Sequence, residues 1–524
     1  MNEVLISTTA SFSKKRILYH YHPGYNTLTS TFKNCPDDLP SLLQDSQSSN
    51  DHMLLQILSL SPKPPLAQVE PLFGSMALFS LSSSGTLSKL TETFYFDSTP
   101  DPIRHKYGFI YGKKPRVSEE AVCCAFSLPH DVLYSKSSTY VLVFHVYKIT
   151  TGDTDSMLAY YARGSSPKDT LLESTKRMMH HQSPIAMGLY KLTADTENMS
   201  KKFGFLTVKM FAVKSPFTMS DLFVVQYMTG VDSTITEPIS LEIKFTITNA
   251  GTEDKIVQSA STILRPEVAP RLLPAQLYKN SDVIGFSPRG GGDIVRLLPI
   301  PPHPSSATVE DMIKRMISFF DNTLFVYPIS LERFQHRNLT LRFQLVVLND
   351  SSRNFSDANS IRDADVSVLT SVYDVSHQPS LCDEAFTKIF YHNVAPTLND
   401  EIKIMMPMNL SHDHFLKVTA YHVHVQPKSH GRHFIELGNA YINLVSADGS
   451  LIEDKEYVIQ LSPTQEMLDD VRSKAGILSR DQYVQSPIVR IRTRSLSSSL
   501  STCSYVRYLC YVNLLSKLIS LHLR

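Results

Sequence analysis

The stretch that decides the fold is Lys388–Val425, which reads KIFYHNVAPTLNDEIKIMMPMNLSHDHFLKVTAYHVHV. In 400–407, apolar and charged residues alternate with the two-residue period of a half-buried strand: Ile402, Ile404 and Met406 against Glu401 and Lys403. In 415–425, both faces are apolar or β-branched, as in a strand inside a sandwich: Thr419, Tyr421, Val423 and Val425 on one face, Leu416, Val418 and Ala420 on the other. The stretch holds no acid–base pair, nucleophile or phosphate cradle, so it predicts a surface module rather than a reaction centre.

Strand patterns of this kind recur on both sides of the stretch. From Leu324 to Ser462 at least seven short strands with turn signals predict one antiparallel sandwich, with Gly438 at a strand kink. An earlier series predicts another β unit, in which Tyr140–Ile149 is a central strand, Gly74 marks a close backbone approach or a bulge, and Thr170–His181 is a helix. The predicted fold class is therefore mainly β, with two antiparallel β-sandwich units joined by a Pro/Gly-rich linker and one helix.

The length of 524 residues is too great for a single core. Composition shifts divide the chain into a disordered lead-in at 1–50, a β-rich unit at 51–265, a linker plus helix at 266–320, a second sandwich at 321–495 and an atypical tail at 496–524. The helix in the linker is predicted at Thr308–Phe320, which opens with a capping pattern and carries an apolar stripe. The apolar tail is interrupted by Arg507 and Lys517, which argues against a membrane span.

Charge and cysteine usage exclude several classes of protein. The formal net charge of +1 provides no broad basic field for nucleic acid. The six cysteines form no Cys-x-x-Cys pair and suit neither a disulfide framework nor a structural zinc site. The N-terminus lacks an apolar region of signal-peptide length, so we expect a cytoplasmic protein.

Several motifs together resemble the C2-type domain of the dedicator-of-cytokinesis (DOCK) family. The resemblance rests on Tyr391, His392, Pro396, Asn399–Lys403, Pro407, Asn409, Leu410, His414–Leu416 and Tyr421–Val423. It extends to Leu324–Pro328, Leu437–Leu444 and Asp448–Gly449, and to an upstream pair of segments, Glu70–Phe79 and Phe94–Asp97. It ends near Ser501.

The resemblance implies the N-terminal portion of a guanine nucleotide exchange factor for Rho-family GTPases, similar to the Cdc/Rac-directed, zizimin-like branch. Such a chain is a GTPase regulator rather than an enzyme with its own active site. The family contacts its GTPase through a C-terminal region that we do not find in this sequence. The resemblance further implies a C2 domain that binds phosphoinositide-containing membrane and recruits the protein peripherally from the cytoplasm, with no cofactor.

Basic residues in two loops of the second sandwich are the candidate lipid-binding residues: Arg333, His336 and Arg337 in one loop, and Lys428, His430 and Arg432 in the other. The loops flank strands that we expect to lie side by side, so their charges would converge on one end of the sandwich. Charge-assisted hydrogen bonds from such groups hold phosphates, at about 1 kcal/mol per basic residue near an anionic surface.

Alternative sites have less support in the sequence. Aspartates of a long polar loop, Asp350, Asp357, Asp363 and Asp365, would be the ligands of a calcium-dependent C2 domain. His422 and His424 share a strand face and form a His-x-His pair that lacks further zinc ligands at a suitable spacing. A scaffold fragment that contacts an adaptor protein without lipid affinity remains the alternative function.

Overall fold

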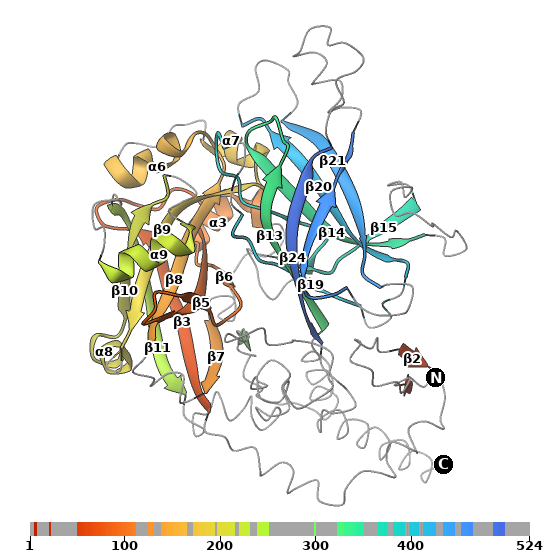
Figure 1. Cartoon of the computed structure of the whole chain (residues 1–524). Coiled ribbons are helices and arrows are strands. Elements are labelled where there is room, and N and C mark those ends of the chain that lie inside the picture. Colours follow the sequence, from red (N-terminus) through yellow and green to blue (C-terminus); the bar gives the residue numbers. More distant parts are fainter. Residues whose placement is uncertain are drawn as a thin grey trace, which may run out of the picture.

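A computed structural model describes most of the two predicted β units. The described residues are 5–7, 20–22, 50–111, 123–129, 138–164, 171–193, 196–214, 219–230, 238–250, 298–299, 322–349, 365–374, 381–393, 396, 398–407, 410, 412–425, 433–445, 452–464 and 486–497. These residues are mainly antiparallel strands grouped in two units, which confirms the predicted fold class (Figure 1).

The first unit is built on one curled ten-stranded antiparallel sheet. Its strand order is β12-β7-β3-β11-β10-β9-β8-β4-β5, with β6 paired to β4. The strands are β3 (Asn50–Pro62), β4 (Phe73–Ser82), β5 (Leu87–Lys89), β6 (Phe94–Asp97), β7 (Cys123–Pro129), β8 (Ser138–Ile149), β9 (Gln182–Leu192), β10 (Leu206–Ala212), β11 (Pro238–Ala250) and β12 (Leu298–Pro299). The predicted central strand, β8, pairs with β4 over Ser138–Tyr147 and with β9 over Tyr140–Ile149.

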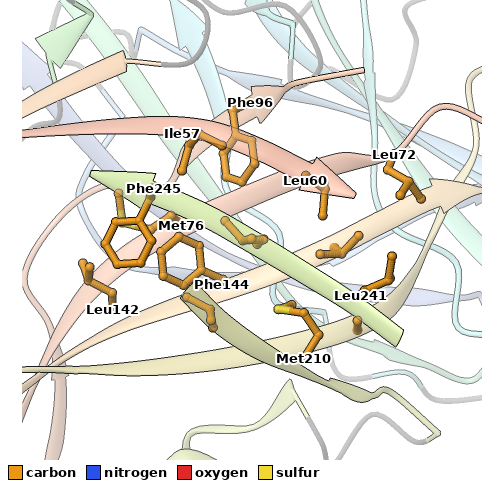
Figure 2. Close-up of a cluster of buried hydrophobic side chains, with 14 of the residues drawn as sticks. Ile57, Leu60, Leu72, Met76, Phe96, Leu142, Phe144, Met210, Leu241 and Phe245 are labelled. Atoms are coloured by element: carbon orange, nitrogen blue, oxygen red, sulfur yellow. The ribbon is translucent and has the colours of Figure 1, made fainter. Parts of the chain in front are cut away.

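The inner face of this sheet forms an apolar core, part of which Figure 2 shows. Phe144 from β8 packs against Phe245 from β11, with 5.4 Å between ring centroids. Gly74 lies where a Cβ atom would be 2.2 Å from Cζ of Phe96, which confirms the predicted close approach. A side chain at this position would displace the Phe96 ring, because interiors of this kind are close-packed.

Six helices are described around the first sheet. They are α3 (Asp101–Lys106), α4 (Gly108–Tyr111), α6 (Thr154–Arg163), α7 (Leu171–Arg177), α8 (Thr196–Phe203) and α9 (Asp221–Thr229). Helix α7 confirms the predicted helix at 170–181 but ends earlier, and a turn leads to His181 and β9. Asp153 caps α6 through a 2.7 Å bond to the amide of Ser156, and Gly164 ends it with a φ of 64°.

The second unit is a sandwich of two six-stranded sheets. One sheet has the order β17-β16-β19-β13-β24-β22, and the other has β15-β14-β20-β21-β23 with β18 paired to β14. The first comprises β13 (Asn322–Glu332), β16 (Val372–Tyr373), β17 (Leu381–Cys382), β19 (Ile402–Met405), β22 (Glu456–Gln460) and β24 (Ile488–Ser497). The second comprises β14 (Leu339–Leu348), β15 (Val366–Leu369), β18 (Ala385–Phe386), β20 (His414–Val423), β21 (Phe434–Asn443) and β23 (Ser462–Pro463).

The core of the sandwich lies between its two sheets. Leu416, Val418 and Ala420 of β20 point into this core, as their shared face predicts. Gly438 borders a bulge at Leu437 in its own strand β21 and lies where a Cβ atom would be 2.8 Å from the carbonyl oxygen of Ser462. The predicted kink is therefore a close backbone approach that admits only glycine without rearrangement.

The two units pack together along the stretch 388–401. The amide of Ile389 donates to the carbonyl of Gln182 over 2.8 Å, and Ile389 and Phe390 join an apolar cluster with Val143 and Tyr147 of β8. Helix α9 contributes Phe223 and Val224 to the same cluster. The stretch that decides the second sandwich is thus also its contact with the first unit.

This contact corrects the sequence interpretation of β19. The alternation in 400–407 predicts that Glu401 and Lys403 face solvent, but they are 1% and 5% exposed. The first unit covers them: Lys89 Nζ lies 2.5 Å from Glu401 Oε2, and Lys403 Nζ lies 3.2 Å from Glu92 Oε2. A period-two pattern identifies the polar face of a strand but cannot show what packs on that face.

Some predicted segments lie outside the described residues. In the linker at 266–320 only β12 is described, as an edge strand paired with β7, and the predicted helix Thr308–Phe320 is outside. In the lead-in at 1–50, β1 (Leu5–Ser7) and β2 (His20–His22) form a two-stranded sheet. Of the tail at 496–524, only the last two residues of β24 are described.

Candidate functional site

The loop between β13 and β14, residues 333–338, alternates between exposed and buried residues. Arg333, Gln335 and Arg337 are exposed, while Phe334, His336 and Asn338 are buried. Phe334 belongs to the sandwich core, and its burial holds the loop against the end of the sandwich. Its fixed shape presents both arginines to solvent.

Left-handed backbone at each end gives this loop its shape. Arg333 has a φ of 63° and Asn338 a φ of 52°. Asparagine tolerates this region better than most residues, because its short side chain bonds to nearby backbone groups. Asn338 is therefore suited to the point where the loop turns into β14.

Asn338 joins three segments at this end of the sandwich. Its Oδ1 accepts a 2.7 Å bond from the amide of His392, and its Nδ2 donates over 3.3 Å to the carbonyl of Val423. The amide of Val423 in turn donates to the Asn338 carbonyl over 3.1 Å. Asn338 therefore holds the 333–338 loop against the end of β20 and the 391–393 turn.

His336 was predicted to contact the lipid headgroup, but its side chain is buried. It is 5% exposed, and its ring centroid lies 5.1 Å from that of His422. His422 Nδ1 lies 2.5 Å from the carbonyl oxygen of Arg337, so this nitrogen carries the proton and donates. His336 and His422 therefore support the loop from inside, while Arg333 and Arg337 are exposed.

The second predicted loop connects β20 to β21. Lys428, His430 and Arg432 lie outside the described residues. The residues that flank them are described: the amide of His424 donates to the carbonyl of His433 over 2.8 Å, which closes the base of the loop. Because β20 and β14 are antiparallel and Leu339 pairs with His422, the loop before Leu339 and the loop after Val423 leave the same end of the sheet.

Strand β24 begins at this end as well, since Ile488 pairs with Glu332. Arg490 Nε lies 2.5 Å from Glu332 Oε1, and Arg490 NH1 lies 3.7 Å from Glu456 Oε1. The hydrogen bond from Arg490 lowers the pKa of the Glu332 carboxyl. Glu332 is therefore held by Arg490, and the neighbouring Arg333 and Arg337 remain exposed at the end of the sandwich.

The alternative metal sites fall partly within the described residues. In the part of the chain that the structure describes, no group of three or more His, Cys, Asp or Glu residues has the arrangement of a metal site. His422 and His424 lie on one face as predicted, with ring centroids 4.1 Å apart. Of the four aspartates proposed for calcium, only Asp365 is described.

Sequence reasoning missed Asn338, His392 and the support given by His422. An Arg-Asn pair directly before a strand is a signal for a left-handed turn residue, so Asn338 was recognisable. The contact of Asn338 with His392 joins residues 54 positions apart and has no local signal.

The arrangement at this end is a β-sandwich with basic loops, the general design of a C2 domain. Residues 318–506 match the family described as C2 domain in Dock180 and Zizimin proteins. Among solved structures, a C2 domain of plant Extended Synaptotagmin 1 is similar at 12% identity over 34% of this chain and 98% of that domain, with a TM-score of 0.19.

The chain is also similar to dedicator of cytokinesis proteins. The chain is 22% identical over 440 residues to Dedicator of cytokinesis protein 8 of Homo sapiens, covering 72% of this chain and 19% of that protein. It is 22% identical over 401 residues to Dedicator of cytokinesis protein 6 of Mus musculus, covering 69% and 18%, respectively. Against Dedicator of cytokinesis protein 7 of Mus musculus it is 29% identical over 113 residues, which is 21% of this chain and 5% of that protein.

The second unit therefore matches the DOCK-type C2 domain, and about 70% of the chain is similar to dedicator of cytokinesis proteins. The chain spans about a fifth of the length of the curated relatives that it matches over most of its own length. No helix among the described residues is long and apolar enough to cross a membrane.

Proposed function

We propose that this chain recruits a DOCK-family exchange factor for Rho-type GTPases to membrane, and that its C2 sandwich binds the phosphoinositide headgroup. One observation carries the proposal: the 333–338 and 426–432 loops leave the same end of the sandwich. Arg333 and Arg337 are exposed on the first of these loops. Arginine presents planar, forked donors that suit phosphate oxygens.

The rigidity of the first loop supports the same proposal. Phe334 and His336 are buried, and Asn338 is bonded on both sides, so Arg333 and Arg337 need not be ordered by the ligand. A preformed site loses less conformational entropy when it binds. Lys428, His430 and Arg432 complete the proposed headgroup site from the second loop.

The proposal also covers the branch of the family, the location of the protein and its partners. We infer a protein of the Cdc/Rac-directed, zizimin-like branch that is cytoplasmic and peripherally recruited to membrane. We assign no residue of this chain to nucleotide exchange. The GTPase would be contacted elsewhere in the full-length protein, and an adaptor protein is a further proposed partner.

Liposome co-sedimentation tests the lipid proposal. The full chain should bind phosphatidylcholine vesicles that contain phosphoinositides, and the double variant Arg333→Glu/Arg337→Glu should weaken this binding by about 25-fold, or about fivefold per arginine. Lys106→Glu, a charge reversal on exposed helix α3, serves as the matched control and should bind like the unaltered chain. Equal binding by the double variant and the control would contradict the proposal and favour a scaffold without lipid affinity.

A further inference from the structure

Helix α8 in the first unit reverses the usual placement of polar and apolar residues. Thr196 and Ser200 lie one turn apart and are both 3% exposed. Met199 and Phe203 lie three and seven residues after Thr196, so helical spacing puts them on the same side of α8, yet they are 43% and 57% exposed. A surface helix normally turns its apolar residues to the core, so this helix exposes the residues that it should bury.

Hydrogen bonds explain why α8 keeps this orientation. Ser200 Oγ accepts a 3.1 Å bond from the amide of Ile247 in β11, and Thr196 Oγ1 accepts a 2.8 Å bond from the amide of Thr193. A rotation of α8 that buried Met199 and Phe203 more deeply would displace Ser200 and leave the buried amide of Ile247 unsatisfied. The exposed apolar side chains are therefore a stable feature of the fold.

Residues 201–205, Lys-Lys-Phe-Gly-Phe, are all exposed, and we name this segment the KKFGF hook. Gly204 has a φ of 75°, which reverses the chain after α8 so that Phe205 emerges next to Phe203 along the chain, at 40% exposure. The side chains of five consecutive residues at the end of α8 are therefore open to solvent.

Lysines accompany each phenylalanine of the KKFGF hook. Lys202 Nζ lies 5.4 Å from the ring centroid of Phe203, and Lys244 Nζ lies 4.9 Å from that of Phe205. Lys209, two residues after the outward-facing Thr207 on β10, is also exposed. Lys244 has an acidic neighbour as well, since its Nζ lies 3.3 Å from Oε1 of Glu242.

Leu58, on strand β3 beside β11, is a further exposed apolar side chain. It is the extra residue of a bulge in β3 opposite Lys244 and Phe245, and it is 46% exposed. Large apolar side chains bordered by lysines are the combination that enters the headgroup region of an anionic bilayer: the aromatic rings reach the acyl boundary, and the ammonium groups remain with the phosphates.

We propose that the KKFGF hook is a second membrane-contact site, which inserts Phe203 and Phe205 into the interfacial region of an anionic bilayer. The site lacks the fixed arginines that would select a particular headgroup, so its ligand is a bilayer with phosphatidylserine or similar anionic lipid. In Figure 1, α8 lies at the lower end of the first unit, whereas β13 rises to the 333–338 loop at the upper end of the second. Variants at one site therefore leave the other in place.

Tryptophan fluorescence provides a direct test, because the chain contains no tryptophan. Phe203→Trp in the full chain should show a blue-shifted emission when phosphatidylserine/phosphatidylcholine vesicles are added, and no shift with phosphatidylcholine alone. Leu222→Trp is the matched control, since Leu222 is equally exposed at 56% but lies on α9. Its emission should not change.

Co-sedimentation with the same phosphoinositide-free vesicles separates the two membrane sites. Phe203→Ser/Phe205→Ser should weaken binding by about tenfold or more, and Lys201→Glu/Lys202→Glu by about fivefold per lysine. Leu222→Ser and Arg333→Glu/Arg337→Glu should bind like the unaltered chain. Failure of the phosphoinositide proposal alone would leave these results unchanged.

Two outcomes would overturn the proposal for the hook. One is unaltered vesicle binding by the Phe203→Ser/Phe205→Ser variant together with no emission shift of Phe203→Trp. The other is an emission shift with a soluble poly-glutamate peptide but not with vesicles, which would identify an acidic protein segment as the ligand.

Discussion

Replacing Asn338 by alanine should destabilise the end of the C2 sandwich that carries the candidate site. The substitution removes the 2.7 Å bond from the His392 amide and the 3.3 Å bond to the Val423 carbonyl. His392 is exposed and its amide can turn to water, so the two bonds together contribute about 1–2 kcal/mol. Alanine at a φ of 52° adds about 1 kcal/mol of backbone strain. The total loss is about 2–3 kcal/mol.

Two further variants divide this total into its parts. Asn338→Gly loses the same side-chain bonds without the left-handed strain, so it should be about 1 kcal/mol more stable than Asn338→Ala. Asn338→Asp keeps an acceptor for the His392 amide but no donor for Val423, and should lie between the asparagine and glycine forms. Urea unfolding followed by circular dichroism gives the free energies. Equal stability of the alanine and glycine variants would refute the role of backbone strain, and an alanine variant as stable as the unaltered chain would refute the whole reasoning.

Three other predictions concern the core and the contact between the units. Burial lowers the pKa of His181 to about 3, and its ring packs at 4.7 Å and 4.6 Å from Phe386 and Phe434 of the second unit. Because the folded protein holds this histidine neutral, its stabilisation is complete above the unfolded pKa of about 6.5 and is lost as the pH falls toward 3, by about 2 kcal/mol at pH 5. His181→Phe should therefore flatten the decrease in melting temperature between pH 7 and pH 5, and a parallel decrease in both proteins would count against this assignment. Glu401→Gln should cost about 3 kcal/mol, since Lys89 loses its carboxylate partner and the buried Lys403 keeps only Glu92. Thermal unfolding of this variant within a degree of the unaltered chain would show that the contact is not held by charge. Gly74→Ala should cost about 3 kcal/mol through the clash with Phe96, whereas Gly108→Ala, whose Cβ would meet nothing within 4 Å, should be neutral; equal melting temperatures would disprove the close approach.

The two proposed membrane sites present different kinds of side chain to the bilayer. The 333–338 loop is fixed by buried residues and presents arginines, which favours recognition of phosphate groups. The KKFGF hook presents apolar rings with lysines beside them, which favours a lipid surface without headgroup selection. Substitutions in the 333–338 loop should therefore reduce binding that depends on phosphoinositides. Substitutions in the KKFGF hook should reduce binding to any anionic bilayer.

The sequence by itself determined the β class, the strands with clear alternation and the positions of the special glycines. These features depend on local periodicity and on backbone sterics, which a few neighbouring residues set. The inward face of β20 and the close approaches at Gly74 and Gly438 were predictable for this reason. The exposed arginines were predictable as well, because they lie in a polar loop between two strands.

Tertiary structure alone decided which polar residues are buried. Glu401 and Lys403 have the pattern of a solvent-facing strand edge, yet the first unit covers them and supplies Lys89 and Glu92 as partners. The sequence predicts that His336 is a basic residue of a surface loop, but its ring packs against that of His422, 86 positions away in the sequence. Met199 and Phe203 have the spacing of a buried helix face but are exposed, because the bond from the Ile247 amide holds Ser200, on the same side of α8, nearest the sheet. In each case the deciding partner is distant in the sequence, and local patterns carry no information about it.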